Sequence, residues 1–192
     1  MYDIWENETL KYPKLRVQAG GPFQGKNVAT VLQAFSVLRM NWPSVRWNED
    51  QLRQGLETLK QRTYFIGRWE QLGERPTIIC DSAHNPDGFE TIREQLDPGA
   101  YKQLHVVLGF SSDKEVEKLL VYFPKDAVYY FAKADVPRGM DARVLKEKAK
   151  ALGLMGRAYS SVRNAFLAAK RRAEPSDFIF VGGSIFVVGE VL

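Results

Sequence analysis

The pattern of hydrophobic and polar residues changes near residue 67 and divides the chain into two regions. After that point, short apolar runs alternate with segments in which apolar residues recur at helical spacing. The runs predict strands at 76–80, 103–110, 127–133, 157–160 and 177–183, and the other segments predict helices at 86–96, 113–123, 141–153 and 161–173. Strands that are apolar on both faces and alternate with amphipathic helices indicate an α/β fold, with a mostly parallel sheet covered by helices on both faces.

Two stretches at the ends of this region are less regular. Residues 68–72, with the sequence RWEQL, alternate between polar and apolar and are predicted to form an antiparallel strand at an edge of the sheet. Residues 184–192, with the sequence SIFVVGEVL, leave two alternatives open. Their β-branched and aromatic residues favour a strand, whereas the two glycines before them allow a helix to begin there.

Residues 1–66 have a sparser pattern, which predicts one extended stretch at 14–18 and two helices. The first helix, at 27–39, is expected to bury one face, formed by Val28, Val31, Leu32, Phe35 and Leu38. The second is expected to begin at Asn48, where Gln51 completes a variant of the capping box, and to continue through Leu59. One strand and two helices make a poor core, so we expect this region to be the tail of a larger domain that begins upstream.

Composition and charge limit the classes of protein to which this chain can belong. The chain has 192 residues, of which 45% are hydrophobic, enough for a sizeable core. No apolar run is long enough to span a membrane, and a single cysteine, Cys80, fits the reducing cytoplasm. A net charge of +4 favours anionic ligands such as nucleotides. The basic run at 170–172 is expected to be the solvated end of a helix, so nothing indicates a nucleic-acid partner.

The stretch AGGPFQGKN at 19–27 looks like a phosphate-binding loop. From Gly20 it reads G-x-x-x-x-G-K, but Asn27 stands where the Ser or Thr of such a loop would bind magnesium. Pro22 also removes a backbone N–H that a phosphate would need. We therefore expect residues 20–26 to form a turn that leads into a helix.

Polar residues at the carboxyl ends of the predicted strands are the candidates for a site, because ligands of open parallel sheets bind there. The strand at 76–80 is followed by Asp81, His84 and Asn85, which are well placed to hold a polar ligand. The alternative is structural: Asn85 caps the helix that begins near Pro86, while Asp81 and His84 satisfy amides of the turn. The residues alone do not decide between the two.

Two more loops are expected at the same edge of the sheet. Residues 109–115 contain Asp113 and Lys114, which either meet a phosphate or carboxylate or begin a helix, with Asp113 as its cap. The sequence by itself favours the helix. Arg138 lies in the loop after the next strand. By contrast, His105 inside an apolar strand is expected to be a core residue with satisfied hydrogen bonds, and Cys80 a buried apolar residue.

Five segments occur in an order that resembles a known family. They are GRWEQL at 67–72, PTIICDSAHNPDG at 76–88, VVLGFSSDKEVEKLL at 106–120, PRGMDA at 137–142 and DFIFVGGSIFVVGEVL at 177–192. Together they resemble the carboxyl-terminal third of folylpolyglutamate synthase and dihydrofolate synthase, of the Mur ligase family. The most specific feature is the D-x-A-H-N-P string that begins at Asp81, with Arg68 thirteen residues earlier. Upstream, 24–27 resembles the Q-x-x-N segment that ends the family's central ATPase domain.

The resemblance implies a domain organisation and a set of site residues. It implies the tail of a central ATP-binding domain at 1–66, without a phosphate-binding loop, then a linker and edge strand at 67–74 and a Rossmann-like carboxyl-terminal domain at 75–192. Implied nucleotide contacts are Asn27, Arg68, Asp81 and His84, and less specific glutamate contacts are Lys114 and Ser184. For Asn27 the alternative is a plain helix cap. No catalytic residue or metal ligand is assigned within the chain.

The resemblance also implies a reaction, in which ATP activates a folate carboxylate as an acyl phosphate and the amine of L-glutamate attacks it. The implied ligands are ATP, Mg²⁺, L-glutamate and a folate or dihydropteroate, with the magnesium ligands in the amino-terminal two-thirds that this chain lacks. The chain alone is expected to be inactive, cytoplasmic and monomeric, with no nucleic-acid or membrane partner. The alternative is a stand-alone nucleotide- or ligand-binding or interaction domain without ligase activity.

Overall fold

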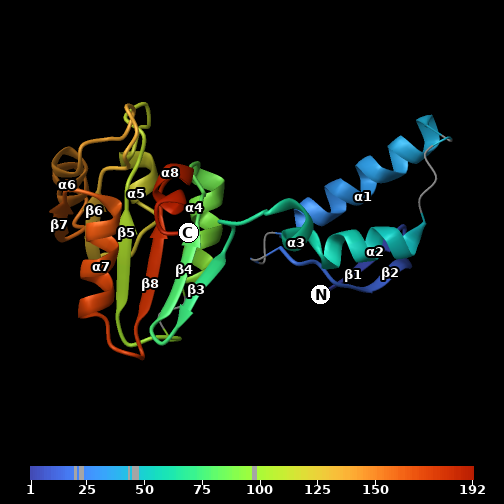
Figure 1. Ribbon diagram of the computed structural model, residues 1–192, viewed down its shortest axis with the longest axis horizontal. Helices are drawn as coiled ribbons and strands as arrows, with labels where there is room; N and C mark the ends of the chain where they lie inside the picture. Colours follow the sequence, from blue (N-terminus) through green and yellow to red (C-terminus); the bar gives the residue numbers. More distant parts are fainter. Residues whose placement is uncertain (20, 22–23, 43, 45–47, 97–98) are drawn as a thin grey trace. The chain divides into compact units, whose positions relative to one another are not determined.

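The computed structural model of this chain describes residues 1–19, 21, 24–42, 44, 48–96 and 99–192. These residues form two units, Met1–Ile66 and Gly67–Leu192 (Figure 1). Each unit has its own buried hydrophobic residues, in one cluster in the first unit and two in the second. Among the described residues, no helix combines the length and the hydrophobicity that crossing a membrane requires.

The described residues of the unit Met1–Ile66 form a hairpin and three helices. Strand β1 (Tyr2–Glu6) pairs antiparallel with β2 (Thr9–Leu15), and α1 (Gln24–Asn41), α2 (Glu49–Glu57) and α3 (Leu59–Thr63) follow. Its core consists of Leu15, Val28, Leu32, Leu52 and Leu56. The capping box of α2 is confirmed: Asn48 Oδ1 accepts from Gln51 N at 2.9 Å, and Gln51 Oε1 accepts from Asn48 N at 3.0 Å.

Three expectations for this unit are wrong. The hairpin was not predicted, and the extended stretch expected at 14–18 overlaps β2 only at its first two residues. Helix α1 begins at Gln24, so Asn27 lies inside the helix and is not its cap. Val31 and Leu38, expected in the core, are 46% and 42% exposed. The turn expected at 20–26 falls partly outside the described residues.

The unit Gly67–Leu192 contains the predicted α/β sheet. Its strands are β3 (Glu70–Glu74), β4 (Thr77–Asp81), β5 (Leu104–Leu108), β6 (Val128–Ala132), β7 (Gly156–Tyr159) and β8 (Phe178–Gly182), in the spatial order β3-β4-β8-β5-β6-β7. Only β3 is antiparallel, and it lies at an edge as predicted. The expected strands and the fold class are thus confirmed.

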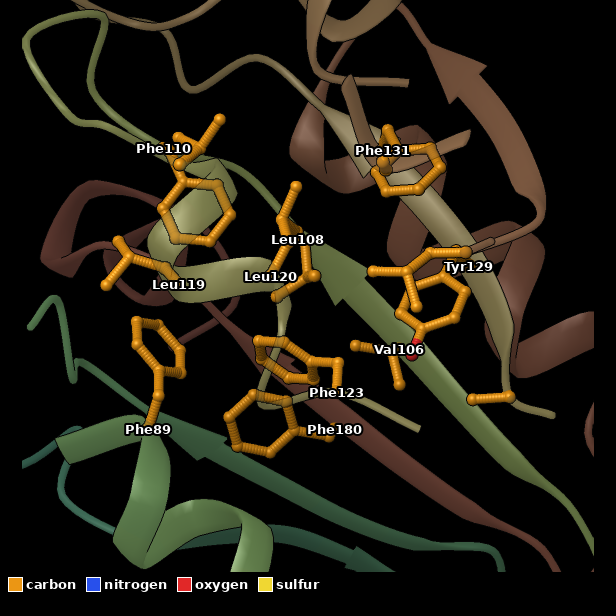
Figure 2. Packing of buried hydrophobic residues seen from close by; sticks show 14 of the residues in the cluster. Phe89, Val106, Leu108, Phe110, Leu119, Leu120, Phe123, Tyr129, Phe131 and Phe180 are labelled. Carbon is orange, nitrogen blue, oxygen red and sulfur yellow. The ribbon is translucent and has the colours of Figure 1, made fainter. Parts of the chain in front are cut away.

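Helices cover both faces of this sheet. One face packs against α4 (Pro86–Gln95), α5 (Glu117–Leu120) and α6 (Ala142–Ala151), and the other against α7 (Val162–Arg172) and α8 (Ile185–Gly189). Figure 2 shows the first layer, where Phe89, Phe123 and Phe180 pack against one another beside the strands. The face against α7 and α8 is built from smaller residues, such as Ala165 and Val187.

Two segments differ from, or decide between, the sequence predictions. The helix expected at 113–123 is confined to α5, because the preceding residues form turns and a bridge to another loop. The ambiguous segment 184–192 forms the helix α8 rather than a strand, with Ser184 as its N-cap. The helical alternative is therefore the correct one.

Candidate functional site

A cavity of about 230 Å³ lies in the second unit, at the carboxyl ends of β4, β5 and β8. The loop that follows β6 also reaches it. Most of its lining residues are polar or charged, and the exceptions are a glycine, an isoleucine and a phenylalanine: Arg68, Ser82, His84, Ser111, Asp113, Lys114, Arg138, Gly183, Ser184, Ile185 and Phe186. Because the carboxyl ends of the parallel strands meet at one edge of the sheet, the cavity brings together residues that are up to 118 positions apart, from Arg68 to Phe186.

A close approach of two strand ends shapes this cavity. Gly183 follows β8 with a φ of +102°, and a Cβ atom on it would lie 2.4 Å from the carbonyl oxygen of Gly109, which follows β5. Gly109 N also donates to the carbonyl oxygen of Gly182 at 3.3 Å. A side chain at position 183 would therefore force the two loops apart.

Asp81 is not among the residues that line the cavity. Its side chain is 1% exposed, with Oδ2 accepting from Trp69 N and Oδ1 from Ala83 N, both at 2.8 Å. Burial raises the pKa of this carboxyl, although the two hydrogen bonds and the charge of Arg68 oppose the rise. The geometry matches the structural alternative, in which Asp81 fixes the turn, and a direct nucleotide contact by Asp81 stays a prediction.

His84 and Asn85 have separate roles in the next turn. His84 is exposed and lines the cavity, and its Nδ1 lies 3.2 Å from the carbonyl oxygen of Ser82. Asn85 caps α4, because its Oδ1 accepts from Gly88 N at 3.0 Å, and Pro86 is the first residue of the helix. Of these two side chains, only that of His84 is therefore available to a ligand in the cavity.

Lys114 and Ser184, the predicted glutamate contacts, both line the cavity. Lys114 is half-buried, and Ser184 is 6% exposed, with Oγ accepting from Val187 N at 3.3 Å. Asp113 also lines the cavity, but it does not cap a helix, since α5 begins only at Glu117. The helix-cap interpretation of Asp113 is therefore wrong.

Arg138 and Phe186 belong to the same cavity, although neither was among the residues assigned to the site from the sequence. The guanidinium carbon of Arg138 lies 4.7 Å from the centre of the Phe186 ring, a cation–π contact. The position of Arg138 after a strand was a sequence signal for the shared edge. The Phe186 ring gave no such signal, because the sequence did not decide between a strand and a helix at 184–192.

The remaining candidates lie elsewhere. Asn27 is in the first unit, on α1, where its Nδ2 donates to Gln24 Oε1 at 3.0 Å, and its role toward a nucleotide stays a prediction. Cys80 is fully buried, as expected, and His105 is a core residue bonded to Tyr130 and Asp177. Among the described residues, no group of three or more His, Cys, Asp or Glu side chains is arranged to hold a metal ion.

Comparison with known proteins gives a consistent family. The profile of the family described as Mur ligase, glutamate ligase domain, matches residues 67–185. A probable bifunctional folylpolyglutamate synthase/dihydropteroate synthase of Haloferax volcanii is 31% identical over 92% of this chain and 20% of its own length. A dihydrofolate synthase/folylpolyglutamate synthase of Escherichia coli K12 is 33% identical over 86% of this chain and 37% of its own length.

Solved structures agree with these relatives. A bifunctional folylpolyglutamate synthase/dihydrofolate synthase with Mn, AMPPNP and L-glutamate bound superposes with a TM-score of 0.73 at 27% identity, covering 93% of this chain and 40% of that one. This chain therefore spans less than half the length of the relatives it matches.

Proposed function

The chain belongs to the Mur ligase family through its glutamate ligase domain, and from this premise we propose that it is the carboxyl-terminal part of an ATP-dependent ligase that adds L-glutamate to folates. The proposed enzyme is a folylpolyglutamate synthase, a dihydrofolate synthase or both. One observation carries the proposal: Arg68, His84, Lys114 and Arg138 converge on one cavity at the carboxyl edge of the sheet. Such a cavity suits anionic reactants.

The reaction joins three anionic molecules. A folate carboxylate attacks the γ-phosphorus of ATP, which forms an acyl phosphate and releases ADP. The amine of L-glutamate then attacks the acyl carbon, an amide bond forms, and phosphate leaves with the electron pair of the C–O bond while the nitrogen loses a proton. The protein must hold these groups together and balance their charge.

We assign the two sides of the cavity to different reactants. Arg68 and His84, beside the end of β4, are proposed to contact the nucleotide phosphates or ribose. Asp81 positions this side by holding the backbone of Trp69. Lys114 and Ser184, after β5 and β8, are proposed to contact glutamate. The relative that binds AMPPNP, Mn and L-glutamate supports the presence of all three kinds of ligand in this family.

The nucleotide and the metal need more than the second unit. ATP supplies the transferred phosphoryl group when it is bound. Asn27 is proposed to contact the adenine, because its amide both donates and accepts hydrogen bonds. The magnesium ligands and the phosphate-binding loop are proposed to lie in the part of the ligase that precedes residues 1–66, which form the tail of its ATP-binding domain. We propose that the whole enzyme is a cytoplasmic monomer.

The second candidate function is a stand-alone nucleotide- or ligand-binding domain without ligase activity. The described cavity alone suits it equally, because binding needs only the second unit. The first unit favours the ligase. Val31 and Leu38 of α1, and Trp42 directly after it, are exposed, as expected of apolar residues that would pack against the rest of a larger domain.

Glutamate transfer tests the proposal directly. The longest reading frame that contains this chain should encode a protein that incorporates labelled L-glutamate into folate or dihydropteroate, with stoichiometric release of ADP. The purified 192-residue chain should show no turnover under the same conditions. Turnover by the isolated chain, or a reading frame that adds no ATP-binding domain, would contradict the proposed function and favour the alternative.

A further inference from the structure

We propose that the open edge of β7 is a docking site for an extended, acidic segment of another protein, which adds a strand to the sheet beside α6. This inference goes beyond the proposed function and does not depend on it, because the groove at this edge shares no lining residue with the cavity described above. Three observations carry it: an open strand edge, a groove beside it and a local excess of positive charge.

Strand β7 is the last strand at one end of the sheet, and in the described part of the chain it pairs only with β6 (Figure 1). Tyr129 N donates to the carbonyl oxygen of Met155, so the backbone groups of 155 and of every second residue after it face β6. The N–H and C=O groups of Gly156 and Ala158 therefore face the open side. These are the groups with which an added strand would pair.

A groove of about 410 Å³ lies at this edge, between α6 and β7. It is lined by Arg143, Lys146, Glu147, Arg157 and Ala158. Ala158 pairs with Phe131, which belongs to the layer that packs against α6, so Ala158 lies on the α6 face of β7 and Arg157 on the opposite face. The small side chain of Ala158 leaves room for the side chains of an added strand, and cations lie on both faces of that strand.

The charge at this edge favours an acidic partner. Residues 143–172 contain nine lysines and arginines and a single acid, Glu147, in a chain whose net charge is only +4. Lys146 Nζ lies 3.7 Å from Glu147 Oε1, whereas Arg143 and Arg157 form no ion pair with a carboxylate of the described residues. Both arginines are exposed. Their guanidinium groups are therefore available to carboxylates of a partner.

The same charge disfavours a second copy of this chain as the symmetric partner. Two β7 strands that met edge to edge would bring their arginines together, and like charges on paired strands repel. An acidic strand replaces this repulsion by attraction. Met155, directly before β7, is 60% exposed and adds an apolar contact beside the cations. Backbone pairing, charge and one apolar contact together define the partner as an extended segment that carries carboxylates.

Titrations of the ¹⁵N-labelled 192-residue chain with capped heptapeptides test the inference. The acidic peptide alternates Glu with Val between terminal Thr residues, and the basic peptide has Lys in place of each Glu. The acidic peptide should shift the amides of 143–147 and 155–159, and it should slow hydrogen exchange at Gly156 and Ala158, whose N–H groups face the open side. The basic peptide should bind at least about tenfold more weakly, because it places like charges together.

Backbone pairing and charge are then tested separately. An acidic peptide with N-methyl groups on its central residues keeps its charge but lacks the donors that pair with β7, and it should bind at least about fivefold more weakly. The double variant Arg143→Gln/Arg157→Gln should bind the acidic peptide about 3- to 25-fold more weakly, as expected for loss of two exposed ion pairs. Lys170→Gln/Arg171→Gln is the matched control, because it removes two exposed cations outside the groove, and its affinity should be unchanged.

Three results would overturn the inference. The first is equal affinity for the acidic peptide and either its basic or its N-methylated form. The second is self-association of the unchanged chain that Arg157→Glu abolishes, since a second copy would then occupy the edge. The third is a DNA duplex that shifts the same amides with the affinity of the acidic peptide, because the groove would then recognise any polyanion. None of these results bears on glutamate transfer, so this inference and the proposed function can fail independently.

Discussion

His105 and His84 show how differently one residue type is used in the second unit. His105 is 2% exposed, with Nδ1 at 2.9 Å from the Tyr130 hydroxyl and Nε2 at 3.2 Å from Asp177 Oδ2. A neutral ring with its proton on Nε2 donates to Asp177 and accepts from Tyr130, which satisfies both nitrogens. His84 is exposed in the cavity. Only the first contributes to the core.

The buried histidine predicts a pH dependence of stability. Burial lowers the pKa of His105, although Asp177 opposes this and Arg172 adds to it. As the pH falls through about 6.5, the unfolded chain binds a proton that the folded unit resists, so the free energy of unfolding should decrease until the pH reaches the folded pKa. The slope should be at most about 1.4 kcal/mol per pH unit.

Exchange of the slowest amide hydrogens in β5 and β8 measures this effect, because it reports opening of the sheet itself. Between about pH 7.5 and about pH 5.5, the unchanged chain should lose stability, and His105→Gln should lose less. Equal slopes in the two proteins would show that His105 does not titrate with unfolding.

At the scale of elements, the sequence predicted those parts of the fold that have a strong hydrophobic period. The strands β4, β5, β6 and β8 were predictable because both of their faces are buried, which leaves continuous apolar runs. The hairpin was missed because its turn, Asn7-Glu8, adopts positive φ at both positions without the glycine that usually marks such a turn.

The short helix α5 was overextended for a different reason. Before α5 begins, Ser112 N donates to the carbonyl oxygen of Arg138, and Ser111 forms a bridge with Gly139. The backbone at 111–112 is therefore paired with a distant loop instead of forming part of the helix. Contacts that the local sequence does not show also limited the prediction of the site. Strand ends predicted where His84, Lys114 and Arg138 gather, but the sequence did not decide whether the Asp81 carboxylate faces a ligand or, as in the structure, accepts from backbone amides.

The junction between β8 and α8 gives a prediction about elements. Gly183→Ala should destabilise the second unit by about 1–3 kcal/mol or more, because the residue has a φ of +102° and its Cβ would meet the Gly109 carbonyl oxygen. Gly189→Ala is the control, since nothing lies within 4 Å of a Cβ there, and it should be neutral or slightly stabilising. Thermal unfolding compares them, and equal melting temperatures would contradict this account of the junction.

At the scale of the whole molecule, the candidate site depends on the sheet rather than on any single motif. Segments near 68, 84, 111–114, 138 and 183–186 meet because parallel strands deliver their carboxyl ends to one edge. The two covering layers of helices hold that edge in place. The loops that carry the cations are therefore held at this edge before any ligand arrives, and such preorganisation favours electrostatic stabilisation of a transferring group.

The central claim is our proposal that this edge serves the ATP of a folate–glutamate ligase, and kcat/KM for ATP in the proposed full-length ligase tests it most directly. Arg68→Ala should lower this value by about 10- to 150-fold, through loss of a charged contact, with the KM for folate little changed. Arg93→Ala, an exposed arginine on α4 outside the cavity, should leave it unchanged. Equal values for both variants would contradict the account.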